Sequence, residues 1–210
     1  MAADPTENWA GDRASRWVAM ADDLEVQLAP VSELLLAAAD LGPGERVLDV
    51  GCGTGPTTRR AAELVAPDGR VVGADVSDEM IAAASARSGE GGVAIDWVVA
   101  DAAIWRPDDP FDVVISRFGV MFFDDPSAAF ANLARGTVPG GRLCVAVWSR
   151  RVDSDMFDLP LTVALAALEE AGIAVDPPPD GYGPFSLADP DAVVSMLEAA
   201  GWRDAAWTPH

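Results

Sequence analysis

The sequence VLDVGCGTG at residues 47–55 decides the fold. The run 47–50 is apolar apart from Asp49 and predicts a buried strand at 46–50. The three glycines that follow at alternate positions predict a tight turn. Pro56 suits the first position of a helix, where its missing N–H is not needed. We therefore expect a strand, a turn and a helix, with a glycine backbone that a ligand can approach at the end of the strand.

The turn carries a fixed negative charge, Asp49, beside its glycines. A dinucleotide pyrophosphate favours a helix N-terminus without a nearby acid, together with a third glycine in the spacing G-x-G-x-x-G. The residue three positions after Gly53 is Pro56, so that spacing is not met. The pattern favours a cationic nucleoside without phosphate over a nicotinamide dinucleotide.

The spacing D-x-G-x-G-x-G, formed by Asp49, Gly51, Gly53 and Gly55, resembles the first motif of class I S-adenosylmethionine-dependent methyltransferases. The resemblance implies that these residues and Cys52 hold the methionine end of S-adenosylmethionine, which leaves as S-adenosylhomocysteine. It also implies an α/β fold: a Rossmann-like, doubly wound, mostly parallel sheet with helices on both faces. The plainer alternative is a glycine-rich turn that only lets a helix pack closely on a sheet.

Asp75 ends a second predicted strand, 70–75, about twenty residues after the glycines, where nucleotide-binding α/β folds place an acid for the ribose hydroxyls. The same spacing is compatible with a dehydrogenase, so Asp75 alone does not identify the cofactor. Residues 73–77 with Met80 also resemble the second motif of the family, which implies apolar contacts from Val76 and Met80 to adenosine. The alternative role of Asp75 is that of a surface or capping acid.

The remaining cofactor residues follow two further predicted strands, 93–100 and 111–116. The resemblance implies that Asp101 faces the adenine amino group and that the backbone N–H of Ala102 serves a ring nitrogen. Asp101 as an ordinary loop acid is the alternative. Ser116 and Arg117 complete the set of expected cofactor-binding residues.

Large apolar residues follow the strand at 111–116, in the run RFGVMFF at 117–123. They are either core residues or the wall of an acceptor pocket, and we favour the wall for Phe118 and Met121. The run resembles the corresponding segment of methyltransferases related to ubiquinone and menaquinone biosynthesis. Trp9 and Trp17, in an amphipathic helical segment ahead of the core, either line this pocket or form a packing cap.

The chain divides into four parts. Residues 1–44 form an N-terminal helical cap and residues 45–148 the cofactor-binding core, which ends in a strand at 142–148. An insertion at 149–186 is either an acceptor-site lid or a packing appendage and includes a stiff connector at 177–181. Residues 187–210 hold a helix and the start of a sixth strand at 201. We expect a truncated sheet edge there. Helices are expected at 31–41, 56–65, 77–87, 126–135, 159–171 and 190–200.

Charge and composition exclude several classes of binding partner. The chain has 14 basic and 34 acidic residues, a formal net charge of −20, which repels nucleic acid and anionic membrane surfaces. No apolar stretch is long enough to span a membrane, and residues 1–8 lack the pattern of a secretory leader, so we expect a cytoplasmic protein. The sole histidine is His210, and the two cysteines have no metal-ligand spacing, so we expect no metal.

The sequence thus predicts methyl transfer from S-adenosylmethionine to a small-molecule acceptor by in-line displacement. No catalytic residue is assigned, because orientation and exclusion of water supply most of the acceleration in such a reaction. The alternatives are a non-catalytic S-adenosylmethionine-binding module and, less favoured, a nicotinamide-dependent oxidoreductase. The oligomeric state stays open, with a homodimer as one option.

Overall fold

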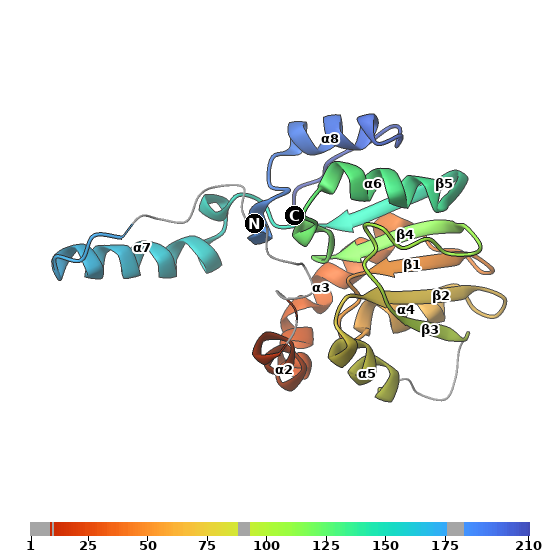
Figure 1. Cartoon of the computed structure of the whole chain (residues 1–210), viewed down its shortest axis with the longest axis horizontal. Coiled ribbons are helices and arrows are strands. Elements are labelled where there is room, and N and C mark those ends of the chain that lie inside the picture. The colour runs from red at the N-terminus through yellow and green to blue at the C-terminus, as the bar shows by residue number, and fades with distance from the viewer. Residues whose placement is uncertain (1–8, 10, 88–92, 176–182) are drawn as a thin grey trace.

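The computed structural model of the chain describes residues 9, 11–87, 93–175 and 183–210. Its described residues form one five-stranded, all-parallel sheet with the order β3-β2-β1-β4-β5 (Figure 1). The predicted Rossmann-like, doubly wound fold is confirmed. The strands are β1 (Arg46–Val50), β2 (Arg70–Asp75), β3 (Ile95–Val99), β4 (Phe111–Arg117) and β5 (Thr137–Ala146).

Helices cover both faces of the sheet. On one face, α3 (Ala21–Ala39) and α4 (Pro56–Leu64) pack on alternate residues of the strands, such as Val47 and Val113, and α5 (Asp78–Ala86) flanks β2 and β3. On the other face, α6 (Pro126–Arg135) and α8 (Pro190–Ala199) bury Leu48, Val114 and their neighbours. The period of two in the strands separates these two cores.

The N-terminal cap differs from the expectation of a helix that starts at residue 31. After α2 (Asp12–Ala19), α3 runs without a break through Pro30. Proline removes the bond to the carbonyl four residues earlier, here that of Val26. Val26 is 80% exposed, so water can satisfy that carbonyl and the helix tolerates the proline.

Strand β5 starts earlier than predicted and includes the turn Pro-Gly-Gly at 139–141. Its pairing with β4 shifts register between Phe111 and Val113, which pair with Thr137 and Arg142. The expectation of a strand from residue 201 is wrong, because residues 201–210 form no strand and Trp202 donates its indole N–H to the carbonyl of Phe130 at 3.1 Å. The tail is thus anchored on α6.

The insertion contains α7 (Asp155–Glu170), which starts four residues earlier than predicted and projects from the sheet domain (Figure 1). None of its residues is buried, and Met156, Leu159 and Val163 are each more than half exposed. The short helices η2 (Arg151–Asp153) and η3 (Gly183–Phe185) flank it, and the expected connector at 177–181 lies outside the described residues.

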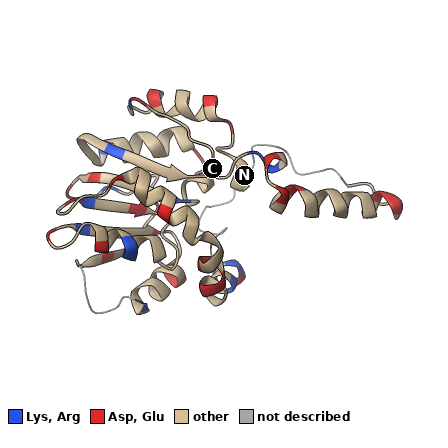
Figure 2. Cartoon of the chain, turned by 180° about the vertical axis from the view of Figure 1, so that it is seen from behind, with Lys and Arg blue, Asp and Glu red and all other residues tan. Residues whose placement is uncertain are grey.

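Acidic side chains are spread over the helices and loops of the described residues, with few basic ones between them (Figure 2). Within the described part of the chain, no helix is long and apolar enough to cross a membrane.

The loop after β1 and the loop after β4 touch backbone to backbone. Gly51 has φ +66°, and a Cβ on it would lie 2.6 Å from the Cα of Gly119. A methyl group at Gly51 therefore fits neither the backbone conformation nor the space.

We expect Gly51→Ala to destabilise the fold more than Gly140→Ala. Gly140 also has a positive φ, +85°, but a Cβ there meets nothing within 4 Å. Gly140→Ala should cost about 1–2 kcal/mol of backbone strain, and Gly51→Ala about 1–3 kcal/mol in addition for the overlap. Urea unfolding of both variants measures this difference. Equal losses would show that the close contact with Gly119 has no energetic weight.

Candidate cofactor site

The glycine loop at 51–55 is fixed on the end of β2. The N–H groups of Gly51 and Cys52 donate to the carbonyl of Ala74 at 2.8 and 3.1 Å, and the N–H of Gly53 donates to Oδ2 of Asp75 at 2.9 Å. A Cβ built on Gly53 would meet only Trp17 Nε1, at 3.9 Å. The loop is therefore a rigid cradle whose backbone a ligand can approach.

Asp75 lies half-buried at the end of β2, as predicted from its position in the sequence. Its other oxygen, Oδ1, accepts the N–H of Ser77 at 2.9 Å. Burial raises the pKa of this carboxyl group, and the backbone donors Ser77, Gly53 and Val76 act in the opposite direction. Each carboxylate oxygen can accept more than one hydrogen bond, so Asp75 keeps the capacity to accept ribose hydroxyls.

Asp49 is almost completely buried, with 1% of its surface exposed. Burial raises its pKa to about 7, while a hydrogen bond from Thr58 and the positive charge of Arg117 lower it. Thr58 Oγ1 donates to Asp49 Oδ2 at 2.6 Å. Thr58 was not among the predicted site residues; the available signal was a hydroxyl side chain in the first turn of the helix after the glycines.

The other predicted cofactor residues lie along the same edge of the sheet. Asp101 follows β3, and its Oδ1 accepts the N–H of Ala103 at 2.9 Å. The loop of Ala102 is held by Asn132 of α6, whose Nδ2 donates to the Ala102 carbonyl at 3.1 Å. Met80 is buried in the first turn of α5, next to the half-buried Val76. Figure 1 shows β1, β2 and β3 side by side, so the residues that follow these strands lie at one edge of the sheet.

Ser116 and Arg117 have different surroundings. The hydroxyl group of Ser116 is fully buried; it donates to the carbonyl of Val50 at 2.7 Å and accepts the N–H of Gly119 at 3.2 Å. Its side chain thus joins β1 to the loop after β4. The guanidinium group of Arg117 donates to Glu25 at 2.8 Å and to Ser32 at 2.6 Å, both on α3.

Aromatic rings form a series that starts at Phe118, directly after β4. Phe118 stacks on Trp148 with ring centroids 4.2 Å apart and planes 6° apart, although Phe118 has the unfavourable φ of +67°. Trp148 contacts Phe157 edge-on, and Phe157 contacts Phe185 in the same way. Trp148, Phe157 and Phe185 were not predicted, because they come from segments that lie far apart in the sequence.

The N-terminal tryptophans, Trp9 and Trp17, contact the loops that follow β4 and β1. Trp9 contacts Trp17 and Phe122 edge-on, at 5.7 and 5.1 Å, and Trp17 lies over Gly53. Met121 differs from the expectation for a pocket wall: it is only 2% exposed and belongs to the core. Its carbonyl accepts the hydroxyl of Ser186, and its sulfur atom the N–H of Trp148.

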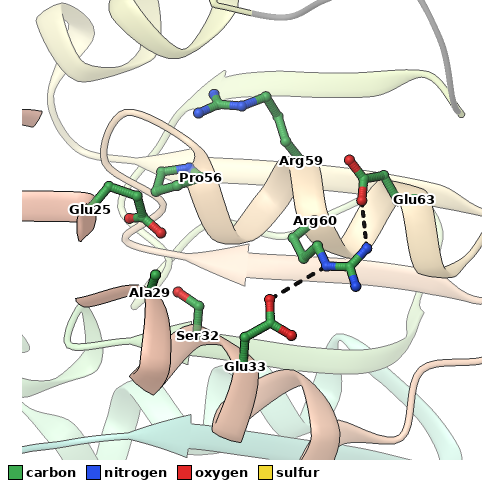
Figure 3. Close-up of a pocket in the computed structure, with 8 residues that line it drawn as sticks. All are labelled: Glu25, Ala29, Ser32, Glu33, Pro56, Arg59, Arg60 and Glu63. Carbon is green, nitrogen blue, oxygen red and sulfur yellow. Dashed lines mark hydrogen bonds and ion pairs between the residues drawn. The ribbon is translucent and has the colours of Figure 1, made fainter. Parts of the chain in front are cut away.

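A polar cavity of about 280 Å³ lies between α3 and α4, next to the start of the glycine-loop helix (Figure 3). Arg60 of α4 forms an ion pair with Glu33 of α3 and another with Glu63 of its own helix. Eight residues line the cavity: Glu25, Ala29, Ser32, Glu33, Pro56, Arg59, Arg60 and Glu63. No cluster of three or more His, Cys, Asp or Glu side chains suited to a metal ion occurs in the described ranges.

Comparisons with known proteins identify the family of the chain. A family model described as a methyltransferase domain matches residues 47–141. A demethylmenaquinone methyltransferase of a Mycobacterium species is 33% identical over 177 residues, which cover 81% of this chain and 73% of that protein. An uncharacterised Mycobacterium tuberculosis protein is 38% identical over 151 residues, 71% of this chain and 52% of its own length. The structure of an S-adenosylmethionine-dependent methyltransferase from Aquifex aeolicus matches with a TM-score of 0.59 at 23% identity, covering 81% of this chain and 78% of that one.

The fold and the site together define a nucleoside-binding α/β protein. The chain belongs to the class I S-adenosylmethionine-dependent methyltransferases and is related to the enzymes of ubiquinone and menaquinone biosynthesis. It spans about half the length of the first curated relatives that it matches, 52% in the mycobacterial proteins. S-adenosylmethionine is the cofactor of this family, and the open backbone cradle at Gly53 and the neighbouring carboxylates suit its cationic, phosphate-free structure.

The burial of the Asp49 carboxyl group predicts how the stability of the chain depends on pH. Its pKa in the folded chain, about 7, lies above its usual value of 3.8, so the folded state binds the proton more tightly. Its contribution to stability is present below about pH 4 and is lost as the pH rises toward 7. We expect Asp49→Asn to gain stability over the wild type by roughly 1–3 kcal/mol between pH 5 and pH 8.

Urea unfolding at several pH values tests this expectation. Thr58→Val removes the hydrogen bond that lowers the pKa of Asp49 in the folded chain, so the stability of this variant should go on falling to a higher pH than that of the wild type. If the profiles of Asp49→Asn and the wild type run parallel from pH 5 to pH 8, the burial of Asp49 has no such effect.

Proposed function

We propose that the chain transfers the methyl group of S-adenosylmethionine to a small-molecule acceptor. The observation that carries the proposal is the meeting, at one edge of the sheet, of the glycine cradle, the buried Asp49, the half-buried Asp75 and a series of aromatic rings in contact. The cofactor would supply a methyl group bonded to a positively charged sulfur. The acceptor's nucleophile attacks the methyl carbon in line, and the sulfur leaves as a neutral thioether. The chain contributes orientation and a water-excluding environment.

The residues of the cradle divide the binding of the cofactor between them. Asp75 accepts the ribose hydroxyls, and Asp49 gives the methionine end a negative environment. Asp101 and the backbone of Ala102 face adenine, with Val76 and Met80 as apolar neighbours. The support is the position of each at the ends of β1, β2 and β3, together with the resemblance of their motifs to those of the family.

The acceptor is placed on the aromatic side of the site. Phe118 and Trp148 present stacked rings, and Trp9 and Trp17 approach the same edge from α2 and the segment before it. Apolar and aromatic walls are typical of pockets for small molecules. The formal net charge of −20 disfavours a nucleic-acid acceptor.

Calorimetric titration with S-adenosylhomocysteine, and with NADH under the same conditions, tests the cofactor assignment. We expect binding of the former alone, and Asp75→Ala should weaken it by about 1–3 kcal/mol, the scale of hydrogen bonds to a charged group. Transfer of labelled methyl groups to a panel of small molecules then tests catalysis. Binding without transfer to any acceptor would favour a non-catalytic binding module, and binding of NADH alone would contradict the cofactor assignment.

We expect Phe118→Ala and Trp148→Ala to change turnover or acceptor range while the affinity for S-adenosylhomocysteine stays within about threefold, less than 1 kcal/mol. The reason is that these rings belong to the aromatic side of the site and not to the glycine cradle. Phe123→Ala is a matched control, because Phe123 packs on Phe130 in the core. A collapse of cofactor affinity in the Phe118 or Trp148 variants would assign these rings to the cofactor instead.

A further inference from the structure

Arg117 places a positive charge beside the methionine end of the proposed cofactor site. Its side chain is 12% exposed, and its charge acts on the carboxyl group of Asp49. Strand β4 lies next to β1, with Ile115 aligned with Asp49. Arg117 stands two residues beyond Ile115 on the same face, nearer the ligand-binding edge of the sheet.

The two nitrogens of the guanidinium group have separate partners. One donates to Ser32, which is 5% exposed, at 2.6 Å, and the other donates to Glu25 at 2.8 Å. The hydroxyl groups of Ser32 and Thr57 lie 3.4 Å apart, so this half of the contact is buried between α3 and α4. Glu25 is the more exposed partner, at 33%, and is the one that can be replaced.

Glu25 also borders the 280 Å³ cavity between α3 and α4 (Figure 3). Arg59 lines the same cavity, and the charge of Glu25 acts on it. The guanidinium group of Arg59 donates to the carbonyl of Thr54 at 2.9 Å. Glu25 therefore borders a space that holds a second guanidinium group besides that of Arg117.

We infer that Arg117 binds the carboxylate of the cofactor's methionine moiety and that Glu25 holds this position beforehand, moving toward Arg59 when the cofactor enters. The inference rests on the proposed function, since it assigns the amino-acid end of the same site. Glu25 belongs to α3, so the exchange also connects cofactor binding to the N-terminal cap. Glu25 is then a competitor of the ligand and not one of its contacts.

The experiment compares two ligands that differ only in the carboxylate group: S-adenosylhomocysteine and its decarboxylated analogue. Calorimetric titration of the wild type should show tighter binding of S-adenosylhomocysteine. Arg117→Met should lower the affinity for S-adenosylhomocysteine by about 10-fold or more, the scale of a charge-assisted hydrogen bond. The affinity for the analogue should not change. Arg117→Lys should keep part of the preference for S-adenosylhomocysteine over the analogue. Glu25→Gln should increase the affinity for S-adenosylhomocysteine several-fold and leave the affinity for the analogue unchanged.

Arg142→Met is the matched control. Arg142 has a similar set of bonds, to Glu45 and to the carbonyls of Ala39 and Asp40, at the opposite end of α3. It should change neither affinity. Thermal unfolding of each variant shows whether it is folded, and Glu25→Gln and Arg117→Lys carry the test if Arg117→Met does not fold.

Two results would overturn the inference while the proposed function stands. One is an equal loss of affinity for both ligands in Arg117→Met, which would show that Arg117 has only a structural role. The other is weaker binding of S-adenosylhomocysteine to Glu25→Gln, which makes Glu25 a cofactor contact. If neither nucleoside binds to the wild type, the proposed function itself fails, and the inference fails with it.

Discussion

The hydrogen bond from the N–H of Gly53 to the carboxylate of Asp75 is the interaction on which the site depends. It joins the loop after β1 to the end of β2 and thereby fixes the start of α4 relative to two strands. The same bond keeps an acid at a half-buried position, where burial raises its pKa. A buried charge is unfavourable without compensation, so the rigid backbone donors are what make an acid possible at this point.

Asp49 extends this argument to a second acid. Both carboxyl groups have raised pKa values, and the charge of Asp75 contributes to the shift of Asp49. Burial thus disfavours the charged form of both carboxyl groups, and Thr58 and Arg117 partly offset this effect at Asp49. A cationic ligand without phosphate relieves the repulsion of the two acids, whereas a pyrophosphate would add to it. The electrostatics of the folded chain therefore agree with the ligand class that the glycine spacing indicated.

The sequence was most informative where structure is local. The bounds of β1, β2 and α6 were predicted correctly, because an apolar run, a glycine turn and a capping Asp125 each act within a few residues. The parallel, Rossmann-like arrangement was predicted through the resemblance to the family. The strand expected at residue 201 was wrong, since an apolar residue after a helix can anchor a tail as well as start a strand.

What the sequence could not predict lies in contacts between distant segments. Thr58 is a common helix residue until the buried Asp49 stands next to it. The pair of Arg117 and Glu25 joins residues 92 positions apart, and no local pattern marks either as a partner of the other. Met121 and Phe118 share one apolar run, yet one packs into the core and the other stacks on Trp148, because the backbone turns at Phe118.

The exposure of helix α7 determines how well this helix tolerates substitutions. It buries none of its own residues and packs mainly on η2 and, through Phe157, on Trp148 and Phe185. Substitutions at exposed positions away from such contacts usually alter stability by no more than about 0.5 kcal/mol. Most of α7 can therefore accumulate substitutions that the sheet would not tolerate. The helix next to the aromatic side of the site can thus diverge while the cradle and the two cores stay unchanged.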